Sequence, residues 1–122
     1  MDNNINYKDV ENMTFDFYQK ESVKTATFPD IGGVKYLYPV LGLAGETGEL
    51  VDKVKKLHRD NNGIITEEWK TSILFEMSDV LWYLSNLCTV LEVPFEQVAR
   101  MNLEKLADRK KRNVIHGSGD NR

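Results

Sequence analysis

The stretch that decides the fold reads GLAGETGELVDKVKKLHR and covers residues 42–59. Its acids Glu46 and Glu49 are three residues apart, so on an α-helix their side chains project from one face. A second stretch, FEMSDVLWYL at residues 75–84, holds a glutamate and an aspartate at the same spacing. The sequence therefore predicts two helices that each present a pair of carboxylates.

Four carboxylates brought together repel one another, and their pKa values rise unless a cation lies between them. Hard oxygen ligands with no Cys or His nearby suit Mg²⁺ or Mn²⁺, and helical bundles build such sites from acids on facing helices. The expected metal ligands are Glu46, Glu49, Glu76 and Asp79. A metal held in this way orients and neutralises a phosphate chain, so we expect chemistry on the phosphates of a nucleotide.

Three glycines and a lysine surround the first acid pair. Gly42, Gly45 and Gly48 recur at helical spacing, although each costs about 1 kcal/mol relative to alanine inside a helix. Their spacing indicates that another backbone or a ligand approaches this face closely. Lys53 follows Glu49 by one helical turn, and we expect it to contact phosphate.

Turn and capping signals divide the chain into helices with short connections. The predicted helices cover residues 14–25, 38–59, 66–91 and 94–111, and no strand is predicted. We therefore expect an all-α fold that resembles a four-helix bundle. The expected divisions are an N-terminal arm over residues 1–13, a helical domain over residues 14–112 and a C-terminal tail over residues 113–122. We expect this tail either to be disordered or to fold over the site.

Two further features of the predicted helices bear on function. The helix over residues 94–111 carries Asn102, Lys105 and Arg109 on one stripe, and such a stripe is suited to phosphate oxygens. The helix before it is apolar on nearly every side between Val80 and Leu91, which a single four-helix chain cannot cover. We therefore expect a homo-oligomer, and a homodimer and a homotetramer are both compatible with this pattern.

Composition limits the class of protein. The 122 residues are enough for one domain, and 41% hydrophobic with 29% charged residues is typical of a globular protein. A net charge of −3 argues against binding to duplex nucleic acid, whose phosphates attract basic proteins. Cys88 is the single cysteine, so no internal disulfide is expected. Because no leader and no bilayer-spanning apolar run is apparent, we expect a cytoplasmic protein without a membrane partner.

Three stretches together carry a resemblance to a known family. They read GLAGETGELVDKVKK, FEMSDVLWYL and MNLEKLADRKKR, and they resemble the MazG-like nucleotide pyrophosphohydrolases of the all-α NTP pyrophosphatase superfamily. The signature of that family is E-x-x-E followed by E-x-x-D, with a downstream Asn and Lys on the last helix. The resemblance covers about residues 15–112, which is most of the chain.

This resemblance implies a MazG fold and hydrolysis of a nucleoside triphosphate between the α and β phosphates with Mg²⁺. By position, it assigns metal binding to the four acids already named and substrate binding to Asn102 and Lys105. Arg109 is our addition from helical spacing. We expect a metal-activated water to attack the α phosphorus, and Glu46 or Glu49 to take its proton.

Two alternatives remain open. One is an enzyme of the same fold with a narrow substrate, such as phosphoribosyl-ATP or a deoxypyrimidine nucleotide. The other is a non-catalytic helical dimer that binds a nucleotide. Trp82 and Tyr83 are suited either to stacking on a base or to packing, and we favour packing because aromatic residues bury large areas.

Overall fold

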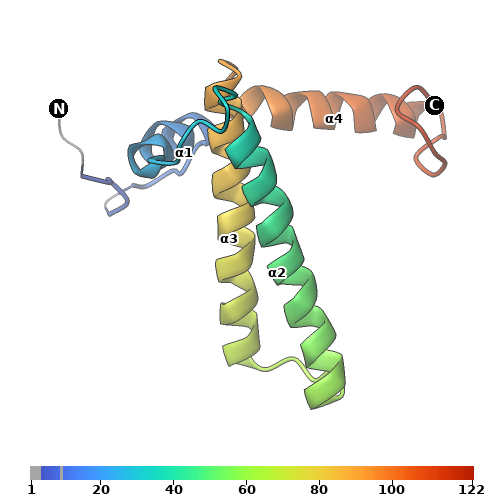
Figure 1. Ribbon diagram of the computed structural model, residues 1–122. Helices are drawn as coiled ribbons and strands as arrows, with labels where there is room; N and C mark the ends of the chain where they lie inside the picture. Colours follow the sequence, from blue (N-terminus) through green and yellow to red (C-terminus); the bar gives the residue numbers. More distant parts are fainter. Residues whose placement is uncertain (1–3, 9) are drawn as a thin grey trace.

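The computed structural model describes residues 4–8 and 10–122, and these residues form four α-helices and no β-strand (Figure 1). The helices are α1 (Phe15–Ser22), α2 (Leu37–Asn61), α3 (Glu67–Val90) and α4 (Phe95–Lys111), with a 3-10 turn, η1 (Val23–Thr25), after α1. The all-α prediction is confirmed, and the helix bounds lie close to the predicted ones. No helix in this described part of the chain is long and apolar enough to cross a membrane.

Local chemistry sets the helix ends. Thr14 and Thr66 cap α1 and α3, because each side-chain oxygen accepts a hydrogen bond from the amide N–H three residues later, at 3.0 and 3.1 Å. Helix α2 ends where Asn62 and Gly63 adopt left-handed backbone conformations, with φ of 51° and 73°. The caps at Thr14 and Thr66 thus lie where the helices predicted over residues 14–25 and 66–91 begin.

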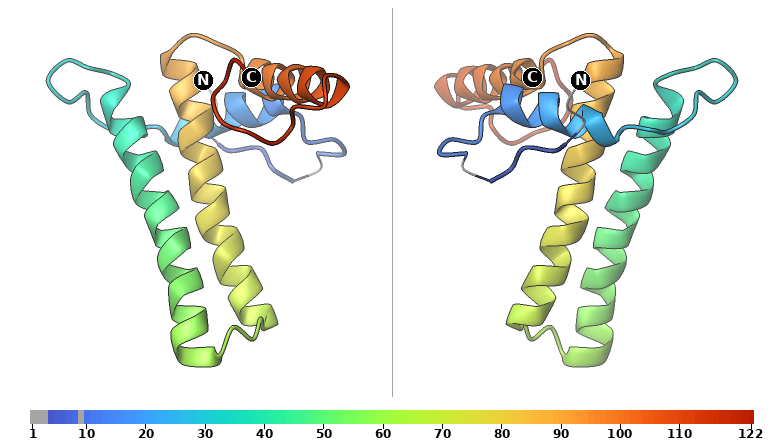
Figure 2. Two further views of the ribbon diagram at one scale, coloured as in Figure 1. Left: turned by 90° about the vertical axis from the view of Figure 1, so that its right-hand side faces the viewer. Right: turned by 90° about the vertical axis from the view of Figure 1, so that its left-hand side faces the viewer.

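Helices α2 and α3 form an antiparallel hairpin, and the other two helices lie across one end of it. Figure 2 shows α3 between α2 on one side and α1 with α4 on the other. Figure 1 shows α4 leaving that end and pointing away from the hairpin. One chain therefore supplies an open hairpin with two shorter crossing helices, and only α2 and α3 run side by side along their length.

The side chain of Gln19 fixes the turn from α3 into α4. Its amide nitrogen donates hydrogen bonds to Val93 O at 2.9 Å and to Thr89 Oγ1 at 3.2 Å, and its Oε1 accepts from the amide N–H of Phe95 at 2.8 Å. The ring of Phe95 also contacts Phe15 edge to face, with centroids 5.1 Å apart. Helix α1 thus determines the direction in which α4 leaves.

The core of the single chain is small. Among the described residues, its buried apolar side chains are Pro39, Leu57, Ile73, Cys88 and Phe95. The region Val80–Leu91, which we expected a second subunit to bury, is covered in large part by the chain itself. There α1 packs on α3, and the buried hydroxyls of Ser22 and Ser85 lie 3.0 Å apart. The exposed apolar side chains of α3 lie mainly earlier, at Leu74, Phe75 and Met77.

The described part of the N-terminal arm lies against α1. The amide N–H of Asn6 donates to Glu21 Oε2 at 2.9 Å, and Lys24 Nζ donates to Asn4 O at 2.9 Å. Residues 1–3 and 9 of the predicted arm lie outside the described residues. These hydrogen bonds hold the described part of the arm beside α1 and the 3-10 turn that follows it.

Candidate functional site

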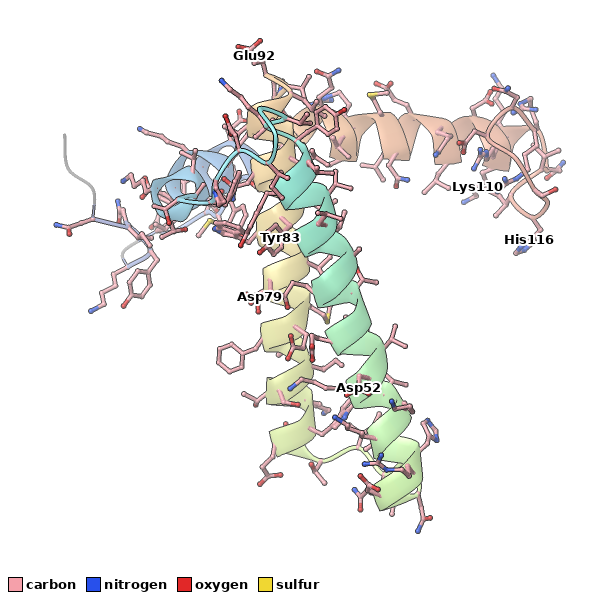
Figure 3. The ribbon with its side chains drawn as sticks, in the orientation of Figure 1. Asp52, Asp79, Tyr83, Glu92, Lys110 and His116 are labelled. Carbon is pink, nitrogen blue, oxygen red and sulfur yellow. The ribbon has the colours of Figure 1, made fainter. Side chains whose placement is uncertain are left out.

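Three of the predicted acids meet in the seam between α2 and α3. Glu46 comes from α2, and Glu76 and Asp79 come from α3. One carboxylate oxygen from each lies within 4.8 Å of the others. Glu46 and Glu76 are half-buried, and Asp79 is exposed. Figure 3 shows Asp79 on α3, with Tyr83 one turn nearer the crossing helices. The two acid-bearing faces therefore converge, and we call these three residues the acid cluster.

The charges of the cluster act on Glu46. Burial raises the pKa of Glu46 above its usual value, and the charges of Asp79, Glu76 and Glu49 raise it further. Carboxylate oxygens so close together suit a hard divalent cation, which would replace their repulsion with attraction. The donor set therefore fits a divalent metal ion.

Glu49 lies at the margin of the cluster. It is exposed, and it is not part of the group of three whose oxygen atoms converge. Its charge still contributes to the raised pKa of Glu46, so the two side chains lie within electrostatic range. The metal-binding and catalytic roles of Glu49 stay predictions.

Lys53 places a positive charge beside the acid cluster. Its Nζ lies 3.2 Å from Glu76 Oε1 across the seam. Lys55 and Lys56, further along α2, both pair with Asp52 instead. Hydrogen bonds from Lys55 and then Lys56 lower the pKa of Asp52 to about 2. Among these lysines, Lys53 is therefore the one placed to contact a ligand of the cluster.

The three glycines of α2 have different surroundings. A Cβ atom at Gly42 would overlap the ring of Tyr83, so this glycine allows α2 and α3 to approach closely. A Cβ at Gly45 or Gly48 would meet nothing within 4 Å. The close approach that we predicted from the glycine spacing is therefore present at Gly42, where the neighbour is a side chain. At Gly45 and Gly48 the helix faces open space.

Two tyrosines lie near the cluster. Burial raises the pKa of Tyr18, and the charge of Asp79 raises it further, so this α1 residue lies within range of the acids. Burial likewise raises the pKa of Tyr83, with added effects of Tyr38, Glu46 and Asp79. Tyr18 is not among the predicted site residues. No local sequence pattern shows which element α1 will contact, so nothing near Tyr18 in the sequence points to the acids.

The polar stripe of α4 lies apart from the acid cluster in this chain. Lys105 Nζ is 3.6 Å from Asp120 Oδ1, and Arg109 Nη2 is 3.5 Å from the same oxygen and donates to Asp120 O at 3.0 Å. Arg109 is 4% exposed beneath the tail. Figure 3 shows Lys110, next to Arg109, near the far end of α4 and well away from Asp79.

The tail therefore folds back on α4, not over the acids of its own chain. The pairing of Asp120 with α4 was not predicted. The sequence signal for it is an acidic residue in a tail that follows a strongly basic helix end. Asn102, Lys105 and Arg109 keep their substrate-binding roles as predictions.

Comparison with known proteins now decides the family. The family model described as MazG nucleotide pyrophosphohydrolase domain matches residues 37–114, which span α2 to α4. The chain belongs to this family. A similar protein is the "Gene 37 protein" of Mycobacterium phage L5, which is 43% identical over 114 residues. The match covers 90% of this chain and all of that protein. None of the solved structures matches the chain significantly.

Membership of the MazG family indicates a nucleotide pyrophosphohydrolase, and hence a hydrolase with a nucleotide substrate. It also agrees with the all-helical structure. The MazG match includes both acid-bearing helices and the polar stripe of α4, but it does not include α1 or the arm.

Proposed function

We propose that this protein is a Mg²⁺-dependent nucleoside triphosphate pyrophosphohydrolase that releases pyrophosphate and a nucleoside monophosphate. The observation that carries the proposal is the acid cluster, in which oxygens of three acids from facing helices lie within 4.8 Å of one another. Membership of the MazG family supports the same class of reaction.

In this proposal, Glu46, Glu76 and Asp79 hold the metal ion. When bound, Mg²⁺ supplies positive charge that offsets the phosphates, and a Lewis acid for the attacking water. Lys53, already beside Glu76, adds a second positive charge next to the phosphate chain. These residues bind and orient the triphosphate so that its α phosphorus faces the water.

Glu49 accepts the proton of the attacking water. It lies on the same face of α2 as Glu46 but outside the group of converging oxygens, so its carboxylate remains available as a base. The water oxygen forms a bond to the α phosphorus, and the bond from that phosphorus to the bridging oxygen breaks. The electron pair leaves with pyrophosphate.

A matched pair of variants tests this division of roles. Glu49→Gln is expected to lose turnover while Mg²⁺ still raises the melting temperature, and Glu76→Gln is expected to lose both. Turnover is measured as pyrophosphate release and distinguished from orthophosphate. Wild-type turnover in Glu49→Gln would remove Glu49 from the chemistry.

A panel of nucleotides separates this function from its alternatives. Pyrophosphate released from several triphosphates supports the proposal. Cleavage of a single compound, such as phosphoribosyl-ATP or one deoxypyrimidine nucleotide, identifies an enzyme of the same fold with a narrow substrate range. Binding without turnover identifies a non-catalytic nucleotide-binding dimer.

We also propose that the enzyme is a homo-oligomer. The chain exposes 9329 Å², whereas a compact monomer of its 14.1 kDa mass exposes about 6,700 Å². Stable homodimers commonly bury about 2,000 Å² or more in total, which the excess of about 2,600 Å² per chain can supply. Exposed apolar residues of the hairpin, including Val51, Leu74 and Phe75, support this surface as the interface.

Oligomerisation would also give α4 a route to the acids. Because α4 points away from its own hairpin, Asn102, Lys105 and Arg109 would meet the substrate from a neighbouring copy. Phosphate oxygens would then take the place of Asp120 beside Lys105 and Arg109. Mixing inactive Glu76→Gln copies with inactive Lys105→Ala copies should restore part of the activity if the site is shared. Sedimentation distinguishes a dimer from a tetramer, and a monomer would contradict the assembly.

A further inference from the structure

A cavity of about 220 Å³ lies between the N-terminal arm and α1. Its walls include Tyr7 of the arm, Phe17 and Tyr18 of α1, and Trp82 of α3, and most of the lining is apolar. Pockets that hold a whole drug-sized ligand measure about 300–1,000 Å³. The cavity is therefore suited to one flat ring and too small for an entire nucleotide.

Two residues of the cavity wall, Trp82 and Tyr18, link it to Asp79 of the acid cluster. Trp82 follows Asp79 by three residues on α3, so the two side chains are neighbours on one helix face. Tyr18 lines the cavity and also lies within range of the charge of Asp79. A nucleotide holds its base one sugar away from its α phosphate. A triphosphate at the acids can thus extend its base toward this cavity.

Glu21 is the ionised group in the cavity wall. Lys24 Nζ lies 2.7 Å from its Oε2, and the same oxygen accepts from the amide N–H of Asn6. The hydrogen bond from Lys24, followed by that from Asn6, lowers the pKa of Glu21, so this buried carboxyl is charged near neutral pH. Oε1 accepts no hydrogen bond from the described residues. A carboxylate oxygen offers acceptors only, and it calls for a donor.

We propose that this cavity binds the nucleobase and that Glu21 selects a base with an exocyclic amino group. This inference rests on the pyrophosphohydrolase function proposed above. The aromatic walls supply stacking, as in sites that bind bases through side-chain rings. The 4-amino group of cytosine donates to the Glu21 carboxylate. Uracil has a carbonyl oxygen at that position, which the carboxylate repels.

Cytidine and uridine nucleotides give the sharpest test, because they differ at that edge of the ring. We expect kcat/KM for pyrophosphate release to be about tenfold higher for CTP than for UTP, since a hydrogen bond to a charged group is at stake. Glu21→Gln should bring the ratio near one, because an amide can donate to O4 of uracil as well as accept from cytosine. Equal wild-type rates for CTP and UTP would overturn the proposal.

Lys24→Met is the matched control. It removes the partner of Glu21 and the hydrogen bond to Asn4 O, but it leaves the carboxylate in place. The preference for CTP should survive in Lys24→Met. If both variants lose the preference to the same extent, Glu21 acts only by holding the arm, and base selection by its carboxylate is rejected.

A binding measurement separates failure of this inference from failure of the proposed function. Trp69→Phe leaves Trp82 as the single tryptophan, and CMP should change its fluorescence at about tenfold lower concentration than UMP. Trp82→Phe, with Trp69 as reporter, should show little change. This outcome supports the base site even if no nucleotide is hydrolysed. Turnover of nucleotides without any CMP response at Trp82 rejects the base site and leaves the proposed function standing.

Discussion

Lys53 Nζ lies 3.2 Å from Glu76 Oε1, so one lysine of α2 reaches across the seam to an acid of α3. Lys53 is one-third exposed and Glu76 less so. The pair joins the two helices at the acid cluster and leaves a cation where the phosphate chain is expected. We therefore expect both stability and substrate binding to depend on this lysine.

Lys53→Met should lower the free energy of metal-free unfolding by up to about 1 kcal/mol, because solvent weakens the pair. The larger effect is expected on KM, which should rise several-fold because a phosphate contact is lost. Urea unfolding and steady-state pyrophosphate release measure the two effects. Lys55→Met, whose partner is Asp52, is the control and should leave KM unchanged. An unchanged KM in Lys53→Met would exclude the phosphate contact.

Glu46→Gln should stabilise the metal-free protein near neutral pH. The folded-state pKa of Glu46 is raised, so the folded chain takes up its proton more readily than the unfolded chain. Its favourable contribution is present below the unfolded pKa and is lost as the pH rises through the raised folded value. Solvent screening limits the gain to about 0.5 kcal/mol.

Melting temperatures at neutral and acidic pH, with Mg²⁺ and with EDTA, check this expectation. The stabilising effect of Glu46→Gln should shrink at acidic pH, and Mg²⁺ should stabilise the wild type more than the variant. A variant that is less stable than the wild type at neutral pH in EDTA would contradict repulsion within the cluster.

Gly42→Ala should destabilise the hairpin by about 1–2 kcal/mol net. The new methyl group overlaps Tyr83, and overpacking of this kind outweighs the gain in helix propensity. Gly45→Ala is the control, because its methyl group enters open space, and it should stabilise the protein by up to about 1 kcal/mol. Denaturant midpoints compare the two. Equal effects of both substitutions would show that Tyr83 moves aside freely.

Phe75→Asp should convert the protein into a folded monomer. Phe75 is 68% exposed in the single chain, and a charge placed in a packed interface is costly. Sedimentation measures the mass, and circular dichroism checks that the helices remain. Lys70→Glu, a charge change elsewhere on α3, should leave the assembly intact. An unchanged oligomer in Phe75→Asp would place the interface elsewhere.

Much of the local structure could be predicted from the sequence, because its causes are local. The caps at Thr14 and Thr66 and the turn at Asn62 depend on neighbouring residues alone. The spacing of Glu76 and Asp79 fixes them on one face of α3, and the convergence with Glu46 follows once the two helices pair.

Contacts between distant segments could not be predicted in this way. Tyr18 lies near Asp79 because α1 packs on α3, and Asp120 pairs with Arg109 because the tail turns back. No periodicity in either segment encodes its partner. The cavity beside Glu21 likewise requires the arm to lie along α1.

The three hydrogen bonds of Gln19 have a consequence for evolution of the assembly. Because this amide holds the start of α4, it sets the angle between the hairpin and the helix that follows. A substitution there would change the direction of α4 while leaving the acids of α2 and α3 in place. We therefore expect relatives with the same acid cluster to differ in quaternary geometry when this one residue of α1 is replaced.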